Sequence, residues 1–215
     1  MALEHRRPSV TFRLIPTEGG VGPSSRQCRP GRKDASWKHG KYSVRAATDA
    51  NDSGIREVRR RTWHDAYDEI WGPETIEAFF GGRVEMRTER EVSWRNQHVH
   101  LVAETKGQIV AVAASGVHRD GEGELRIFYV LPEHQGEGLG RRLWDETLWA
   151  LRECGCDAMC LWALERNLGA RRFYERRGCA AFARRTLWVG DRSQPEVGYR
   201  LDLPAQSVPE GERSA

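Results

Sequence analysis

The most informative segment of this chain is Tyr129-Val130-Leu131-Pro132-Glu133-His134-Gln135-Gly136-Glu137-Gly138-Leu139-Gly140-Arg141-Arg142. It predicts a β-strand, a glycine-rich turn and the first turn of an amphipathic helix. Glycines tolerate positive φ angles and let a backbone approach a ligand closely. The unpaired N–H groups and positive dipole end of the helix favour an anion, and two arginines add positive charge. The segment therefore predicts a pyrophosphate site for a nucleotide-like cofactor.

Other glycine-rich loops fit this segment less well. A Walker A loop requires Lys and Ser or Thr after its last glycine, and neither follows Gly140. The dinucleotide-binding pattern has its third glycine one residue later and opens a βαβ unit near the start of a domain. A tight strand-to-helix turn with no ligand is the plainest alternative. Three alternating glycines beside Gln135 and two arginines make that alternative less attractive.

Two motifs in order indicate a known family. The first is Gln135-x-x-Gly138-x-Gly140, which follows the strand-like residues 129–132. The second is Asn167-x-x-Ala170-x-x-Phe173-Tyr174, which follows an apolar strand and is closed by Gly178. Together they resemble the acetyl-CoA signature of the GNAT superfamily of N-acetyltransferases. The resemblance covers roughly residues 42–203.

The resemblance implies acetyl-CoA as co-substrate and assigns residues to it. Tyr174 is expected to point at the cofactor sulfur and to protonate the departing thiolate, a role that a positioned phenol can fill. Main-chain groups at the end of the strand are expected to meet the pantetheine amides. The cofactor-binding residues predicted in this way are Tyr129, Val130, Gln135, Gly136, Glu137, Gly138, Leu139, Gly140, Arg141, Asn167 and Tyr174. For Asn167 a helix N-cap is an equally physical interpretation.

The base and the acceptor side are less sharply indicated. Glu124, at the start of the strand before the glycines, matches a carboxylate that some family members use through water, although an exposed strand-end Glu is equally plausible. Three histidines are alternatives as the base: His64, His100 and His118. By the same resemblance the first helical region borders the acceptor site, which makes Trp63, His64 and Tyr67 the predicted substrate-binding residues.

The hydrophobic pattern predicts an α/β fold. We expect a GNAT-type mixed, mostly antiparallel sheet flanked by helices, in which only the strands either side of the glycine-loop helix are parallel. The expected strands are 42–46, 98–104, 108–118, 123–130, 157–163, 180–189 and 196–203. The expected helices are about 52–67, 73–80, 83–95, 139–154 and 167–177.

Composition divides the chain into three parts. Residues 1–40 are basic and rich in Gly and Pro, and up to Lys41 nine basic residues face three acidic ones. Such a segment predicts a disordered tail at 1–40. The resemblance implies that an N-acetyltransferase domain follows at 41–204, with a C-terminal tail at 205–215. Only the strand-like residues 10–15 suggest order in the first part. An arm for nucleic acid is a weaker interpretation of the basic tail, so nucleic acid is not an expected partner.

The remaining sequence features exclude several classes of protein. No apolar run approaches the ~20 residues that cross a bilayer, and no signal segment opens the chain, so we expect no membrane association and a cytoplasmic location. The five cysteines lack paired zinc-ligand spacing, which predicts reduced structural thiols and no metal. A homodimer is compatible with the sequence, although no apolar stripe indicates one.

Two functions from different classes follow from these patterns. The first is transfer of an acetyl group from acetyl-CoA to a primary amine of a small molecule or peptide, by direct transfer in a ternary complex. The second is a non-catalytic acyl-CoA-binding regulatory domain, in which Glu124 and Tyr174 have no chemical task. Transfer is the preferred hypothesis, and the sequence does not identify the acceptor.

Overall fold

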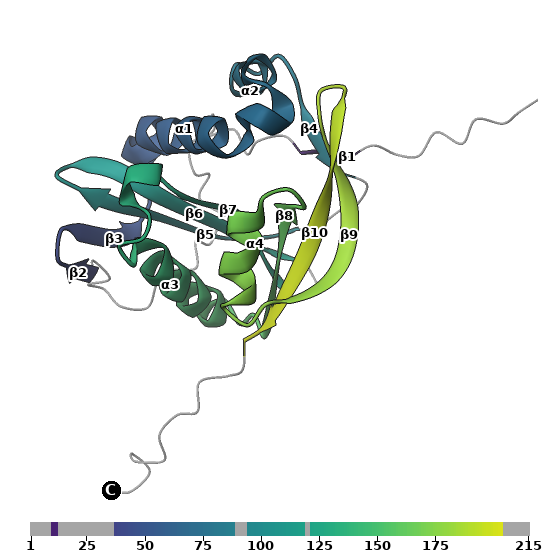
Figure 1. The fold of residues 1–215 in the computed structure, drawn as a ribbon. Coiled ribbons are helices and arrows are strands. Elements are labelled where there is room, and N and C mark those ends of the chain that lie inside the picture. Colours follow the sequence, from purple (N-terminus) through teal and green to yellow (C-terminus); the bar gives the residue numbers. More distant parts are fainter. Residues whose placement is uncertain (1–9, 13–36, 89–93, 119–120, 204–215) are drawn as a thin grey trace, which may run out of the picture.

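The structure is a computed structural model of the 215-residue chain. It describes residues 10–12, 37–88, 94–118 and 121–203, with side chains from residue 40 onward except at 94–98. Strands form one sheet with helices on both faces (Figure 1). The helices are α1 (Asp52–Trp71), α2 (Pro73–Phe80), α3 (Leu139–Glu153) and α4 (Leu168–Glu175), with short 3-10 turns at Asp49–Asn51 and Pro132–His134.

Ten described strands make up the sheet, in the order β1-β4-β9-β10-β8-β7-β6-β5-β3-β2. Their bounds are β1 (Val10–Phe12), β2 (Trp37–His39), β3 (Tyr42–Ala46), β4 (Met86–Thr88), β5 (Trp94–Thr105), β6 (Gln108–His118), β7 (Gly123–Val130), β8 (Ala158–Leu164), β9 (Ala180–Val189) and β10 (Arg192–Asp202). All described pairs are antiparallel except β7 with β8. The helix α3 connects these two strands, as a parallel pair requires. The fold class is therefore as predicted.

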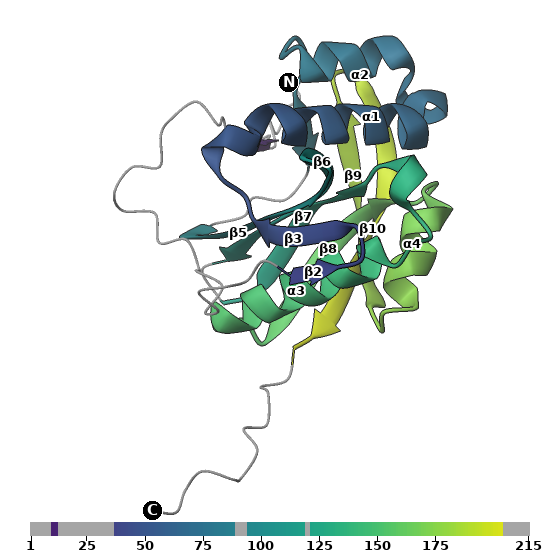
Figure 2. The same cartoon turned by 90° about the vertical axis from the view of Figure 1, so that its left-hand side faces the viewer.

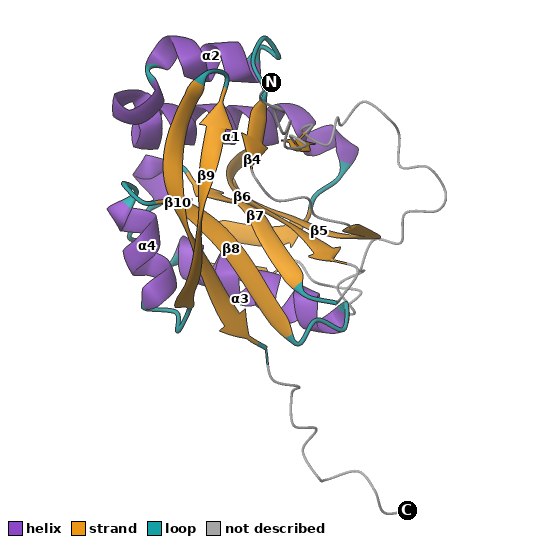
Figure 3. Ribbon diagram, turned by 90° about the vertical axis from the view of Figure 1, so that its right-hand side faces the viewer, coloured by secondary structure: helices purple, strands orange, loops and turns teal. Residues whose placement is uncertain are grey.

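The helices form two layers, one on each face of the sheet. Seen from the side, α1 and α2 lie above the sheet, and α3 and α4 lie below it (Figure 2). The long β9–β10 hairpin curves upward to the level of α2 (Figure 3), where Arg192 donates to the carbonyl of Trp71 at 2.7 Å. No described helix combines the length and apolar character that crossing a bilayer requires.

The sequence explains why α3 forms where it does. Its apolar residues recur at helical spacing, and Leu139, Leu143, Trp144 and Leu151 are each at most 3% exposed. They pack against the sheet in a core that also contains Val112, on the central strand β6. A second cluster of buried residues lies between α1, α2 and the β9–β10 hairpin and includes Trp63, Trp71, Ile76, Phe79, Leu164 and Val189. The first cluster also includes Val58 of α1, so it packs residues of both helical layers against the sheet.

One predicted helix is wrong. The charged segment 83–95 was expected to be helical, but it contains β4 and the start of β5, with residues 89–93 outside the description. Met86–Thr88 pairs with residues 187–189 of β9 instead. This pairing is stabilised by the burial of Thr88 and by the packing of Arg87 over the ring of Trp188. The guanidinium carbon lies 4.8 Å from the ring centroid. Tertiary contacts here override a local charge pattern.

Two short strands lie within residues 1–40. Val10–Phe12 pairs with β4, inside the stretch that looked strand-like, and Trp37–His39 pairs with β3. The rest of the predicted tail and the predicted C-terminal tail lie outside the described residues. Cys156, Cys160 and Cys179 are buried and form no disulfide bond, as expected, whereas Cys154 is disulfide-bonded, so the prediction of reduced thiols is wrong for that residue.

Candidate functional site

The loop between β7 and α3 forms the first half of the site. Gly136 and Gly138 have φ angles of +77° and +83°, which residues with a Cβ rarely adopt. Gly138 is the N-cap of α3 without a side-chain cap, and the first helical hydrogen bond runs from Arg142 N to Gly138 O at 3.1 Å. The N–H groups of residues 139–141 therefore have no acceptor within the helix. This arrangement suits an anionic group such as a diphosphate.

Side chains near the loop fix its position. Glu137 accepts hydrogen bonds from the Tyr42 hydroxyl at 2.7 Å and from Lys41 Nζ at 3.0 Å, which ties the loop to β3. Gln135 Nε2 donates to the carbonyl of Val130 at 2.9 Å, which ties the loop to β7. Both side chains were predicted to bind the cofactor. Their side-chain polar groups already have protein partners, so their main chain is what they can offer a ligand.

The first turn of α3 contributes in different ways. Leu139 is 3% exposed and anchors the helix start in the core. A Cβ on Gly140 would come within 3.7 Å of Phe173 and 3.8 Å of Val130, so α3 starts close to α4 and the end of β7. Arg141 is largely exposed, with its nearest carboxylate, Asp145, at 3.9 Å. Of these residues, Arg141 is the one whose positively charged side chain is available to contact an anion.

The parallel strands separate next to the loop. β7 and β8 pair only from Gly123–Met159 to Leu125–Leu161, and beyond that point they diverge. Leu131 N donates to Val110 O on β6 at 3.0 Å. Because successive peptide groups of a strand point to opposite edges, the N–H of Val130 faces the opening toward β8. It is therefore a main-chain donor in the opening between β7 and β8.

Asn167 bridges this opening. Its Oδ1 accepts from Ala170 N at 3.0 Å, so it is the N-cap of α4. Its Nδ2 donates to the hydroxyl of Tyr67 on α1 at 3.1 Å. One side chain thus connects the helix below the sheet with the helix above it. The N-cap interpretation of Asn167 is confirmed, while a contact with cofactor stays a prediction.

Tyr174 lies below the opening, on α4. Its ring is 8% exposed and packs at 5.7 Å from Trp144 and 6.1 Å from Tyr199, measured between centroids. Its hydroxyl makes no hydrogen bond within the described part of the chain. Burial raises the pKa of Tyr174 above that of an ordinary phenol, and the nearby Tyr129 raises this pKa further. The hydroxyl therefore keeps its proton at physiological pH, as a proton donor must.

Glu124 lies above the opening in a buried polar group. It is 3% exposed, and its Oε2 is 2.9 Å from Nε2 of His118, which is also 3% exposed. Cys160 lies opposite Glu124 across the β7–β8 ladder, and the ligand-type atoms of these three residues lie within 4.8 Å of one another. The expectation of an exposed strand-end Glu is wrong. Two of the candidate bases, Glu124 and His118, form one hydrogen-bonded pair.

The acceptor-side predictions divide in two. Trp63 and Tyr67 face the sheet: Trp63 Nε1 donates to the Tyr129 hydroxyl at 2.9 Å, and the Trp63 and Tyr67 rings are 5.5 Å apart. His64 points elsewhere, with its ring nitrogens 2.8 Å from Asp68 and 2.7 Å from Glu77 on α2. The hydrogen bond with Glu77 is the main cause of the raised pKa of His64. The structure does not bring His64 to Tyr129, and it leaves His100 exposed on β5.

Sequence reasoning missed two side chains on this face, Arg59 and Glu196. Arg59 precedes Trp63 by one helical turn and stacks near Phe80, 5.7 Å from its centroid. Glu196 on β10 is 6% exposed and accepts from Arg185 Nε at 2.6 Å. Burial raises the pKa of Glu196. The spacing of Arg59, Trp63 and Tyr67, four residues apart, indicates that they share one helix face. No sequence pattern indicates that Glu196 lies on the same face of the sheet as Glu124.

Comparison with known proteins agrees with this geometry. The profile of the acetyltransferase (GNAT) family matches residues 61–179. Mycothiol acetyltransferase of Thermomonospora curvata is 28% identical over 84% of this chain and 52% of its own length. The L-amino acid N-acyltransferase MnaT of Escherichia coli is 26% identical over 80% of this chain and 96% of its own. The PaiA N-acetyltransferase of Thermoplasma acidophilum, solved with coenzyme A, superposes with a TM-score of 0.59 at 16% identity, covering 74% of this chain and 98% of its own.

The chain belongs to the acetyltransferase (GNAT) family. Residues 61–179 include α1 from its middle, the glycine loop and α4, which are the elements that build the site. The chain spans about half the length of the mycothiol acetyltransferases that it matches. Family membership fixes the class of protein, and the particular acceptor is a separate question.

Proposed function

We propose that the protein transfers the acetyl group of acetyl-CoA directly to a primary amine. The single observation that carries the proposal is the opening between β7 and β8, which has an anion-binding loop on one side and a protonated phenol and a buried carboxylate beside it. The diphosphate would lie on the N–H groups of residues 136–141. The thioester would lie in the opening, where the N–H of Val130 faces the acetyl oxygen.

Three groups of the chain have chemical tasks in this proposal. Glu124, through water, accepts the proton that an ammonium must lose before it can attack, since a lysine-type amine has a pKa of ~10.4. The N–H of Val130 stabilises the negative charge that develops on the acetyl oxygen. Tyr174 donates its proton to the departing thiolate. His118 holds Glu124 in place through their 2.9 Å hydrogen bond.

Direct transfer is favoured over an acyl-enzyme because the nearby thiols are not activated. A nucleophilic cysteine needs a lowered pKa and access to the substrate. Cys160 is completely buried, and burial raises the pKa of Cys179 to about 11. Cys179 therefore remains a protonated thiol at physiological pH, and Cys160 is not accessible to a substrate.

The acceptor is proposed to be a small-molecule or peptide amine. The support is that curated relatives are named for mycothiol and L-amino acid acylation, and that α1 places aromatic side chains rather than a flat polar surface above the opening. Trp63 and Tyr67 are the residues proposed to border this acceptor.

Steady-state kinetics with an amine panel test the proposal. Release of CoA thiol should depend on the amine, and product formation should match thiol release one for one. Varying both substrates should give intersecting double-reciprocal lines, as a ternary complex requires. Parallel lines would contradict direct transfer, and tight acetyl-CoA binding with no acceptor-dependent release would favour the non-catalytic alternative.

A further inference from the structure

Arg59 differs from the other arginines of its helix. Arg56 donates to the carbonyl of Phe80 at 2.6 Å, Arg60 pairs with carboxylates on α1 and α2, and Arg61 pairs with Glu133 at 2.8 Å. Arg59 is partly buried, has no carboxylate within 4.0 Å among the described residues, and its buried Nε lacks a hydrogen-bond partner. Desolvation lowers its pKa. A partly buried guanidinium without an anion is costly unless a ligand supplies one.

The position of Arg59 places this charge at the acceptor side of the opening. It lies one turn before Trp63, which donates to the hydroxyl of Tyr129 at 2.9 Å. The Arg59 guanidinium lies 5.7 Å from the centroid of Phe80, whose ring is 5.5 Å from that of Trp63. The positive charge of Arg59 also favours the ionised form of the Tyr129 hydroxyl. The negative charge of Glu196 contributes to raising the pKa of Tyr129, and the negative charge of Glu124 contributes to raising the pKa of Glu196. The face above the opening therefore has one cationic side chain near Tyr129 and two buried carboxylates farther along the sheet.

We propose that the acceptor amine also carries a carboxylate, and that Arg59 binds this carboxylate. This inference rests on the proposed function and narrows its substrate to small, amino-acid-like molecules. A guanidinium offers two parallel N–H donors that match a carboxylate, and the interaction is strong where water is excluded. The ammonium end of such a molecule is then directed toward Glu124, opposite in charge. Charge at both ends orients the acceptor before transfer.

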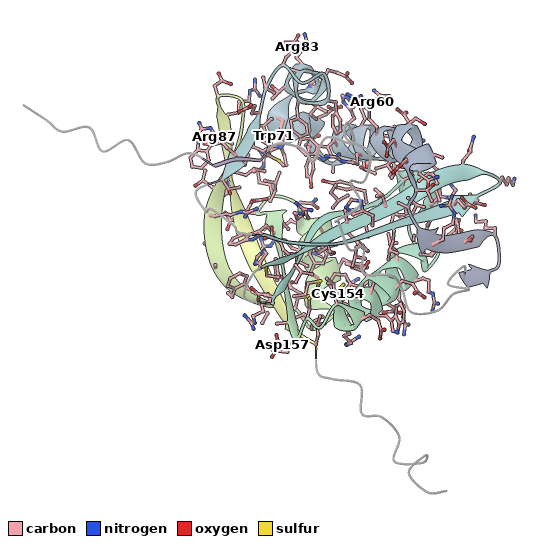
Figure 4. All side chains as sticks on the ribbon, turned by 180° about the vertical axis from the view of Figure 1, so that it is seen from behind. Arg60, Trp71, Arg83, Arg87, Cys154 and Asp157 are labelled. Carbon is pink, nitrogen blue, oxygen red and sulfur yellow. The ribbon has the colours of Figure 1, made fainter. Side chains whose placement is uncertain are left out.

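The experiment uses the full chain loaded with coenzyme A, so binding is measured without turnover. A panel of L-amino acids and their matching C-terminal amides is titrated by calorimetry against wild type, Arg59→Met and Arg60→Met. Arg60 is the matched control because it is on the same helix and points to the outer surface (Figure 4), where Glu57 and Glu77 hold it. Arg59→Lys keeps the charge and should recover part of the affinity.

For the members that bind, wild type and Arg60→Met should prefer the acid to the amide by roughly tenfold or more. In Arg59→Met this preference should fall to about onefold, with coenzyme A affinity unchanged and a thermal transition no lower than that of wild type. Amides that bind as well as acids, absence of binding by all acids, or a preference that survives Arg59→Met would overturn the inference. Acids that bind through Arg59 without any release of CoA from acetyl-CoA would instead leave the carboxylate site standing and contradict the transferase proposal.

Discussion

The two sides of the β7–β8 opening are built in different ways. Below the sheet, the loop at residues 135–141 presents main-chain N–H groups, and the side chains of Gln135 and Glu137 anchor it. Above the sheet, the polar groups are side chains from α1, β6, β7 and β10 that meet only in the folded protein. A main-chain site can be shared by proteins with many acceptors, whereas a side-chain site changes with each substitution. This difference separates what the cofactor requires from what the acceptor requires.

Loss of the proton donor between the two sides should have the largest effect. Tyr174→Phe removes one hydroxyl from a packed ring, so kcat should fall about a hundredfold or more while the KM for acetyl-CoA changes little. Because the pKa of Tyr174 is raised, wild-type activity should show no alkaline loss attributable to this residue below pH ~10. Tyr199→Phe is the matched control, since the Tyr199 ring packs against Tyr174 but its hydroxyl hydrogen-bonds with Arg171 and Glu175. Equal activity of Tyr174→Phe and wild type would remove Tyr174 from the chemistry.

The second largest effect is expected on the acceptor side, from Glu124→Gln. The amide keeps the shape and a hydrogen bond to His118 but cannot take a proton, so kcat/KM for the amine should fall about a hundredfold at pH 7. The deficit should shrink as the pH rises toward the pKa of the amine, because free amine is then supplied by solvent. Kinetics at several pH values measure this.

A metal at the same group is a competing explanation for such a loss. His118, Glu124 and Cys160 have metal-ligand chemistry. The proposed role of Glu124 needs no ion, so activity of wild type should be unchanged after dialysis against a chelator. Activity that is lost with the chelator and restored by a divalent cation would contradict a simple base.

A smaller effect, confined to the affinity for acetyl-CoA, is expected from a substitution in the glycine loop. Gly138→Ala forces a side chain into φ +83°, a strain of about 1–3 kcal/mol, so affinity for acetyl-CoA should fall about tenfold or more with the acceptor KM unchanged. Gly155→Ala imposes a similar strain at φ +79° beyond the other end of α3, and should lower stability without changing affinity. If both variants lose the same affinity, the loop does not act locally.

The smallest effect concerns the bridge between the two sides. Asn167→Ala removes an N-cap, so the free energy of unfolding should fall by about 1 kcal/mol, or about 2–4 °C in the thermal midpoint. Asn167→Asp keeps the capping oxygen while losing the donor to Tyr67, so it should regain most of that stability. An Asp variant as unstable as the Ala variant would show that the contact with Tyr67, rather than the cap, carries the stability.

The same contrast explains what the sequence could predict. The bounds of β3, β6, β7, β9 and α2, and the parallel β7–β8 pair, follow from local periodicity and turn glycines. The conformation of the glycine loop can also be predicted, because it depends on residues that are adjacent in the sequence. The strand at 86–88 was missed because its partner β9 is a hundred residues away. The Glu124–His118 pair and the unpartnered Nε of Arg59 depend on which strands and helices become neighbours, and no local pattern encodes that.

Titration of acetyl-CoA into the full chain, followed by calorimetry, tests the central claim most directly. One molecule should bind per chain with micromolar affinity, and Gly138→Ala should weaken this binding while Gly155→Ala does not. Absence of heat from a folded wild-type chain at millimolar ligand would contradict a diphosphate site at the start of α3.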